Sequence, residues 1–221
     1  MTRTKTASRG TMPRSSETSI RDRVLSAAFS AFMERGYERA STLDIATRAK
    51  VSKRELYTLF DDKHAMLTAC IAERAKRMRL PLNLPAVESR AALAATLNQF
   101  GIAILQGVCD PKVLAVYRLA IAESDRSPEI ARVLDRAGRE PNRAALVELL
   151  TMAQANGLVG TVEPATMAAR FFALIWGDLL VRLLLRVTNV PKPAELEQRV
   201  RSATETLMAL YPEPAGAKES G

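Results

Sequence analysis

Apolar residues recur at helical spacing through most of the chain, beginning at Ile20. In the first such stretch they occupy one face of a helix, at Ile20, Val24, Leu25, Ala28, Phe29 and Phe32. Gly36 is expected to end this helix, because glycine adopts the left-handed conformation that closes helices without a steric penalty. The sequence has no sustained alternation of apolar and polar residues and no hairpin dipeptide. It therefore predicts an all-α fold.

Two short helices are predicted next, separated by a turn of three residues. Ser41 and Asp44 have the spacing of a capping box, so the first helix should begin there and run for about two turns. Residues 50–52 form the turn, and Ser52 can cap a second helix that ends near Phe60. Helices joined by so short a turn must cross steeply. This is the geometry of a helix-turn-helix motif.

The second of these helices has two distinct faces. Leu56 and Phe60 are four residues apart and should point to the core. The opposite face is polar and carries Lys53, Arg54, Tyr57 and Thr58. In helix-turn-helix proteins such a helix enters the major groove of DNA.

Each residue of the polar face can be interpreted either as a DNA contact or as an ordinary structural or surface residue. Arg54 is the best candidate for reading a base, because a guanidinium can pair bidentately with guanine. Lys53 borders the apolar edge and should reach a phosphate instead. The alternative is that Tyr57 lies at the edge of the core and that the basic residues are ordinary solvated charges. Their occurrence together on this scaffold favours contact with DNA.

The segment ASTLDIATRAKVSKRELYTLFDDK, residues 40–63, resembles the tetracycline-repressor (TetR) family of transcription regulators. The first helix is similar too, including its closing Gly36-Tyr37. The family pattern continues through Ile45-Ala46, Val51-Ser52, Leu56-Tyr57, Phe60 and Lys63. The rest of the chain matches the family only in its general character, as a variable all-helical body for ligand binding and dimerisation.

The resemblance implies roles for individual residues. Thr42 and Ser52 would contact phosphates, Lys63 would grip a phosphate from the start of the fourth helix, and the recognition helix would meet DNA through Lys53, Arg54, Tyr57 and Thr58. Two positions depart from the family pattern. Leu59 replaces a His or Tyr that often contacts phosphate, and Lys50 replaces the usual turn glycine. Lys50 is expected either to be strained in a left-handed conformation or to add a phosphate contact.

Longer helices are predicted after the fourth helix, which begins at Asp61-Asp62. Helical periodicity resumes near Ala91, and new helices open at Asp110-Pro111, Ser127-Pro128, Glu163-Pro164 and Pro193, which brings the total to about nine. The expected organisation is a disordered basic arm at 1–18, a helix-turn-helix DNA-binding domain at 19–63, a helical ligand-binding and dimerisation domain at 64–212, and a disordered tail at 213–221.

The helix expected from Glu163 to about Arg186 is so apolar between Phe171 and Leu185 that it should be buried nearly all round. A homodimer in which the last two helices of each subunit form a four-helix bundle would bury it, and the resemblance implies the same. A symmetric dimer requires a roughly palindromic operator in double-stranded DNA. A small-molecule effector could occupy an apolar pocket lined by Phe100, Ile104, Tyr117, Phe172 and Trp176, although each of these is also a plausible core residue.

Charge supports the DNA-binding interpretation. The chain has 221 residues and a net charge of +8, and residues 1–63 alone hold 13 basic and 8 acidic residues. More than half of the positive excess thus lies in the part with the helix-turn-helix pattern, as expected for a protein attracted to a phosphate polymer. Cys70 and Cys109 are too far apart to indicate a zinc site or a disulfide framework, so we expect no metal and no cofactor.

The N-terminal residues contain no apolar core of a signal peptide, and Asp178 and Arg182 interrupt the most apolar stretch. We therefore expect a cytoplasmic protein with no membrane partner. Two other classes of protein have less support. An enzyme has little support, because His64 is the single histidine and no catalytic or phosphate-loop motif occurs. A helical small-molecule-binding protein without DNA binding would not explain the basic N-terminal part. The sequence thus predicts a ligand-responsive DNA-binding regulator. Because repression is the commonest mode in the family, the resemblance implies a repressor.

Overall fold

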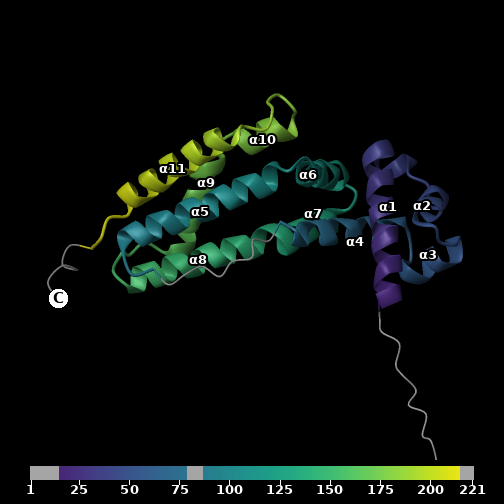
Figure 1. Ribbon diagram of the computed structural model, residues 1–221, viewed down its shortest axis with the longest axis horizontal. Helices are drawn as coiled ribbons and strands as arrows, with labels where there is room; N and C mark the ends of the chain where they lie inside the picture. The colour runs from purple at the N-terminus through teal and green to yellow at the C-terminus, as the bar shows by residue number, and fades with distance from the viewer. Residues whose placement is uncertain (1–14, 79–86, 215–221) are drawn as a thin grey trace, which may run out of the picture. The chain divides into compact units, whose positions relative to one another are not determined.

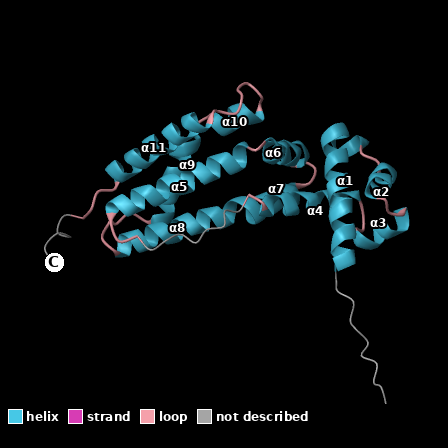
Figure 2. Ribbon diagram, in the orientation of Figure 1, coloured by secondary structure: helices cyan, strands magenta, loops and turns pink. Residues whose placement is uncertain are grey.

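The computed structural model describes residues 15–78 and 87–214. Within these residues the chain forms helices and connecting loops without a strand, which confirms the predicted all-α class (Figure 1, Figure 2). The helices are α1 (Ser15–Arg39), α2 (Thr42–Ala49), α3 (Lys53–Leu59), α4 (Lys63–Lys76), α5 (Arg90–Cys109), α6 (Pro111–Glu123), α7 (Pro128–Leu134), the π-helical turn η1 (Asp135–Arg139), α8 (Glu140–Ala155), α9 (Pro164–Trp176), α10 (Leu179–Leu184) and α11 (Pro193–Leu210).

The chain divides into two compact units, residues 1–70 and 71–221. Residues 1–14 of the predicted arm lie outside the described residues, whereas residues 15–18 already belong to α1, so this helix begins earlier than expected. Residues 215–221 of the predicted tail also lie outside the described residues. Residues 213 and 214 follow α11 without regular secondary structure.

The first unit packs α1 against α2, and α2 against α3. The predicted face of α1 is buried from Val24 to Phe32, and Ile20 at its start is half-buried. The regular helix is interrupted at Gly36, where φ is 76° and ψ is 166°. This left-handed φ is favourable for glycine, which confirms that Gly36 closes the helix. Ile45, Ala46 and Ala49 of α2 face the core as predicted.

The second unit has its own core, built mainly where α5 and α9 pack against α11 and where α8 packs against α9. Of the described helices, α5 alone is long and apolar enough to cross a membrane by length and composition. Its residues Leu93, Leu97, Phe100, Ile104 and Leu105 are at most 4 % exposed, so α5 is a buried core helix.

The prediction of one continuous helix from Glu163 to Arg186 is wrong. The chain forms two helices there, because Gly177 adopts φ 47° and ψ −124° and ends α9 before α10 begins. In the single chain Val181 is 58 % exposed and Leu185 is 68 % exposed, so burial of this segment nearly all round would require a second copy and stays a prediction. This break and the π-helical turn between α7 and α8 explain why the described chain has more helices than the nine expected.

Candidate DNA-binding interface and ligand cavity

Helix α3 begins with a reciprocal cap. The Ser52 hydroxyl accepts a hydrogen bond of 3.1 Å from the Glu55 backbone N–H, and the Glu55 carboxylate accepts one of 2.7 Å from the Ser52 N–H. These bonds stabilise the ionised carboxylate and lower the pKa of Glu55 below its ordinary value. Glu55 is thus an additional residue of this interface. The spacing Ser-x-x-Glu at 52–55 is the signature that identifies it.

The exposed face of α3 carries the four residues expected there, while Leu56 is fully buried and Phe60 is 5 % exposed. Lys53, Arg54, Tyr57 and Thr58 are all exposed. The Tyr57 hydroxyl lies 3.4 Å from the Thr42 hydroxyl at the start of α2, and the Lys53 ammonium lies 5.8 Å from the centre of the Tyr57 ring. The structure thus brings Thr42, Lys53 and Tyr57 together across the two helices of the motif.

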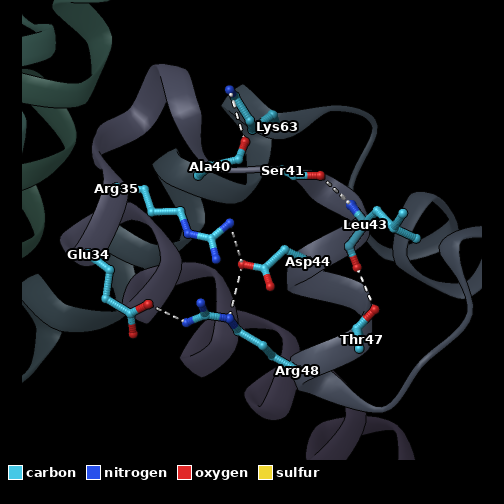
Figure 3. A network of polar contacts seen from close by, with 9 residues as sticks. All are labelled: Glu34, Arg35, Ala40, Ser41, Leu43, Asp44, Thr47, Arg48 and Lys63. Atoms are coloured by element: carbon cyan, nitrogen blue, oxygen red, sulfur yellow. Dashed lines mark hydrogen bonds and ion pairs between the residues drawn. The ribbon is translucent and has the colours of Figure 1, made fainter.

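The capping box predicted at Ser41 and Asp44 is wrong, although Ser41 does cap α2. Its hydroxyl accepts from the Leu43 N–H at 3.2 Å, while the Asp44 carboxylate turns to two arginines (Figure 3). Asp44 lies 3.0 Å from Arg48 and 3.5 Å from Arg35. An ion pair with α1 is available to Asp44 only in the folded unit, and it replaces the local bond to the Ser41 backbone.

Arg48 joins the same network to a second carboxylate of α1. Its guanidinium lies 2.8 Å from Glu34 (Figure 3), and the hydrogen bonds to Glu34 and Asp44 raise the pKa of Arg48. Exposed ion pairs contribute little individually, but this network links α2 to α1 at several points. It therefore helps to hold the helix-turn-helix in one geometry.

Lys63 makes several contacts within the first unit. Its ammonium group donates to the backbone carbonyl of Ala40 at 3.3 Å (Figure 3). It also donates to the carbonyls of Tyr37 and Glu38 at 2.8 and 3.1 Å, and it lies 4.5 Å from the centre of the Tyr37 ring. An ammonium group has three protons, so these bonds use all of its donors. Lys63 therefore closes the end of α1 in this structure, and this structural role competes with the phosphate contact that the resemblance implies, which stays a prediction.

Lys50 adopts the left-handed conformation, with φ 56° and ψ 48°, and its N–H donates to the carbonyls of Ala46 and Thr47. Of the two expectations for Lys50, strain in a left-handed conformation or an added phosphate contact, this supports the strain. Leu59, the other departure from the family pattern, is half-buried. Two basic residues that sequence reasoning did not single out also pack against the motif. Arg23 donates to the Ala49 carbonyl at 3.2 Å, and the Arg21 guanidinium lies 4.7 Å from the centre of the Phe60 ring.

A cavity of about 370 Å³ lies within the second unit. Its described lining includes Ile104, Tyr117, Phe172 and Trp176, so four of the five candidate ligand residues meet at one site. Phe100 does not line it. This residue is 2 % exposed and packs against Phe171 and Phe172 with ring centres 6.4 and 6.0 Å apart, which is the core position considered as its alternative.

The polar part of the cavity was not anticipated. It comes from the π-helical turn and the start of α8, through Asp135, Arg139, Glu140, Asn142 and Arg143. The Asn142 amide donates to the Met78 carbonyl at 2.9 Å and to the Gly138 carbonyl at 3.3 Å. A π-helical turn widens a helix locally and often occurs at functional sites. No apolar periodicity in the sequence signals it.

These features define a helix-turn-helix DNA-binding regulator with a separate helical unit that contains a cavity. Residues 24–70 match the family model described as bacterial regulatory proteins, tetR family, and residues 95–213 match the AefR-like transcriptional repressor C-terminal domain. The chain belongs to the TetR family of transcriptional regulators. It is therefore a DNA-binding transcriptional regulator and not an enzyme.

Individual relatives agree with this assignment. An uncharacterised helix-turn-helix transcriptional regulator of Bacillus subtilis, YvkB, is 25% identical over 180 residues, which are 79% of this chain and 90% of that protein. A TetR regulator from Agrobacterium tumefaciens is 26% identical with a TM-score of 0.77, covering 88% of this chain and 95% of its own. The flavonoid-responsive regulator FrrA is 27% identical with a TM-score of 0.74, covering 89% and 98%.

Proposed function

We propose that this regulator is a repressor that binds a two-fold symmetric operator as a homodimer and leaves it when a small, largely apolar molecule enters the cavity. The observation that carries the DNA-binding part is the exposed polar face of α3 on a capped, closely braced helix-turn-helix. The description of the C-terminal family model as an AefR-like transcriptional repressor supports repression.

Within this proposal the DNA contacts divide into two kinds. Arg54 reads a base edge, because it is exposed on α3 and its planar guanidinium can bond guanine bidentately. Thr42, Ser52, Lys53, Tyr57 and Thr58 position the helix on the backbone and groove edge. The Thr42 and Tyr57 hydroxyls are already within 3.4 Å of each other, so one phosphate oxygen could accept from both.

Fluorescence anisotropy with labelled DNA from upstream of the regulator's own gene tests this part. Replacing Arg54 with Ala should relax discrimination at one base step in each half-site by about 1–3 kcal/mol. Arg132→Ala is a matched control, because Arg132 is an exposed arginine on α7 in the second unit. If both variants discriminate between operator sequences as the wild type does, Arg54 is not the base reader.

A homodimer is supported by apolar surface at the C-terminal helices. Val181 and Leu185 of the α10 segment, followed by Val187 and Val190, are 44 to 68 % exposed. Burying such side chains against a second copy would be favourable. Sedimentation of a Val181→Asp and Leu185→Asp double variant should show monomers where the wild type forms dimers. Val162→Asp, at another exposed valine, should remain dimeric.

The ligand part of the proposal rests on the cavity and its connection to α4. Met78, two residues beyond the end of α4, lines the cavity and accepts the hydrogen bond from Asn142. A ligand that prefers one position of Met78 would shift the population of α4 conformations, and α4 begins at Lys63 in the DNA-binding unit. The similar regulator FrrA is described as flavonoid-responsive, which supports a small organic effector for the present protein as well.

Loss of operator binding on addition of a ligand tests this part. An effector should lower operator affinity in the wild type and have little effect on Asn142→Ala, in which the connection to Met78 is broken. A helical small-molecule-binding protein that does not bind DNA is the alternative. It predicts no salt-sensitive, sequence-selective binding to any upstream DNA.

A further inference from the structure

The charged groups around the cavity cancel one another. Its described lining contains two carboxylates and two guanidinium groups, contributed by Asp135, Arg139, Glu140 and Arg143. Arg139 lies 3.5 Å from Asp135, and Arg143 lies 3.8 Å from Glu140. Each arginine therefore already has a carboxylate within its own helical turn. Among the lining residues that the structure describes, the rim therefore offers neither an unpaired cation to a carboxylate ligand nor an unpaired carboxylate to an amine.

The interior of the cavity is aromatic. Tyr117, Phe172 and Trp176 come from α6 and α9, and aliphatic side chains such as Ile104, Val108 and Leu180 complete the wall. Aromatic side chains in the wall favour aromatic ligands, because offset stacking and edge-to-face contacts add to the burial of apolar surface. A volume of about 370 Å³ is near the lower end of small-molecule pockets, which suits a molecule of two or three rings.

Tyr117 supplies a hydroxyl group to this interior. It is 8 % exposed, and burial raises the pKa of its hydroxyl, with a smaller opposing effect from Arg139 and a smaller reinforcing effect from Asp135. The hydroxyl therefore stays protonated at neutral pH and can both donate and accept a hydrogen bond.

From these observations we propose that the cavity selects electrically neutral aromatic molecules carrying a hydroxyl or carbonyl group that bonds to the Tyr117 hydroxyl. The inference rests on the proposed function, in which this cavity holds the effector, and it names the chemical class. A charged ligand would lose its hydration without gaining an unpaired opposite charge, and this cost is larger than that of burying a neutral polar group that finds a partner.

Trp176 makes occupancy directly measurable. It is the single tryptophan of the chain and it lines the cavity, so quenching of its fluorescence reports binding without DNA. The probes are four molecules of one shape: biphenyl, 4-hydroxybiphenyl, biphenyl-4-carboxylate and 4-(aminomethyl)biphenyl. With the full-length protein at neutral pH, we expect 4-hydroxybiphenyl to bind at least about tenfold more tightly than either charged probe. Tightest binding of a charged probe, or no quenching by any probe, overturns the proposal.

Two variants test the two recognition elements separately. Tyr117→Phe should weaken 4-hydroxybiphenyl by roughly three- to tenfold, the effect of one hydrogen bond, and leave biphenyl unchanged. Asp135→Asn should leave Arg139 without its carboxylate and raise the affinity of biphenyl-4-carboxylate relative to 4-hydroxybiphenyl. If both variants bind all four probes in the same order and with the same ratios as the wild type, the assigned recognition is wrong.

A third variant locates the binding site. Ala169→Phe places a ring where a small side chain lines the cavity, and it should abolish quenching by every probe. Quenching that persists in this variant would place the probes elsewhere and overturn the inference. Circular dichroism of the variant checks that the helical fold is retained.

The same probes separate this inference from the proposed function. Binding of 4-hydroxybiphenyl with unchanged operator affinity would uphold the ligand class and contradict release by this ligand. Release of the operator by a charged molecule that quenches Trp176 more strongly than 4-hydroxybiphenyl would uphold ligand release and contradict the class.

Discussion

The internal bonds of Lys63 lead to a prediction opposite to that of a phosphate contact. If Lys63 held a phosphate, its removal would weaken binding to all DNA sequences alike and leave folding unchanged. It would also reduce the salt slope, the slope of the logarithm of the binding constant against the logarithm of the salt concentration, by about one unit. If it closes the end of α1, its removal should lower the free energy of unfolding and leave the salt slope of the folded protein as it was.

The size of the effect follows from the contacts. A hydrogen bond to a charged group contributes about 1.5–3 kcal/mol, and an exposed cation–π contact about 0.5–1 kcal/mol. The bond from Lys63 to the Tyr37 carbonyl is the shortest of the three and is partly buried, whereas water can replace the exposed bond to Glu38. We therefore expect Lys63→Met to lower the free energy of unfolding by about 2–4 kcal/mol.

Urea unfolding followed by far-ultraviolet circular dichroism measures the stability, and anisotropy titrations over a range of salt concentrations measure the slope. Lys53→Met is the matched control, because Lys53 is exposed on α3 and should affect the slope rather than the stability. An unchanged unfolding curve for Lys63→Met, together with a salt slope reduced by one unit, would refute the structural role and restore the phosphate contact.

Three further predictions concern local structure. Replacing Lys50, whose φ is 56°, with Gly should raise the free energy of unfolding by about 1 kcal/mol, because glycine adopts this left-handed conformation without strain. Lys50→Ala keeps the strain and should not raise it, and chemical denaturation measures both variants. The pKa of Glu55 is lower in the folded than in the unfolded chain, so its ionised carboxylate stabilises the fold above the unfolded pKa, and this stabilisation is lost as the pH falls through the folded pKa. The melting temperature of Glu55→Gln should therefore be below that of the wild type at pH 7, and the two should become equal in acid. A Cβ at Gly101 would lie 2.6 Å from the side chain of Val200, so Gly101→Ala should destabilise by about 1–3 kcal/mol, whereas Gly107→Ala, with open space around it, should be neutral or stabilising in thermal melts.

Much of this molecule follows from interactions within a few residues. The face of α1, the left-handed closure at Gly36 and the cap at Ser52 depend on helical periodicity and on backbone preferences of single residues. The polar face of α3 could be predicted for the same reason, because Leu56 and Phe60 determine which side points inward. The resemblance of residues 20–63 then indicated the family without any knowledge of the rest of the fold.

Other features depend on residues far apart in the chain. Lys63 meets carbonyls 23 to 26 residues away, and Asp44 leaves its own helix start for an arginine of α1. Local patterns contain no information on such partners, because a side chain exchanges a local bond for a distant one only when packing brings the distant group close.

The cavity, too, has features that the sequence indicates and features that depend on the tertiary structure. The amino-acid sequence by itself indicated apolar and aromatic candidates, since Ile104, Tyr117, Phe172 and Trp176 recur on helices of an apolar body. Only the tertiary structure placed Phe100 in the core and brought the paired charges of the π-helical turn to the rim. Periodicity indicates which face of a helix is buried, whereas the packing of several helices decides which buried side chains contact one another and which line a cavity.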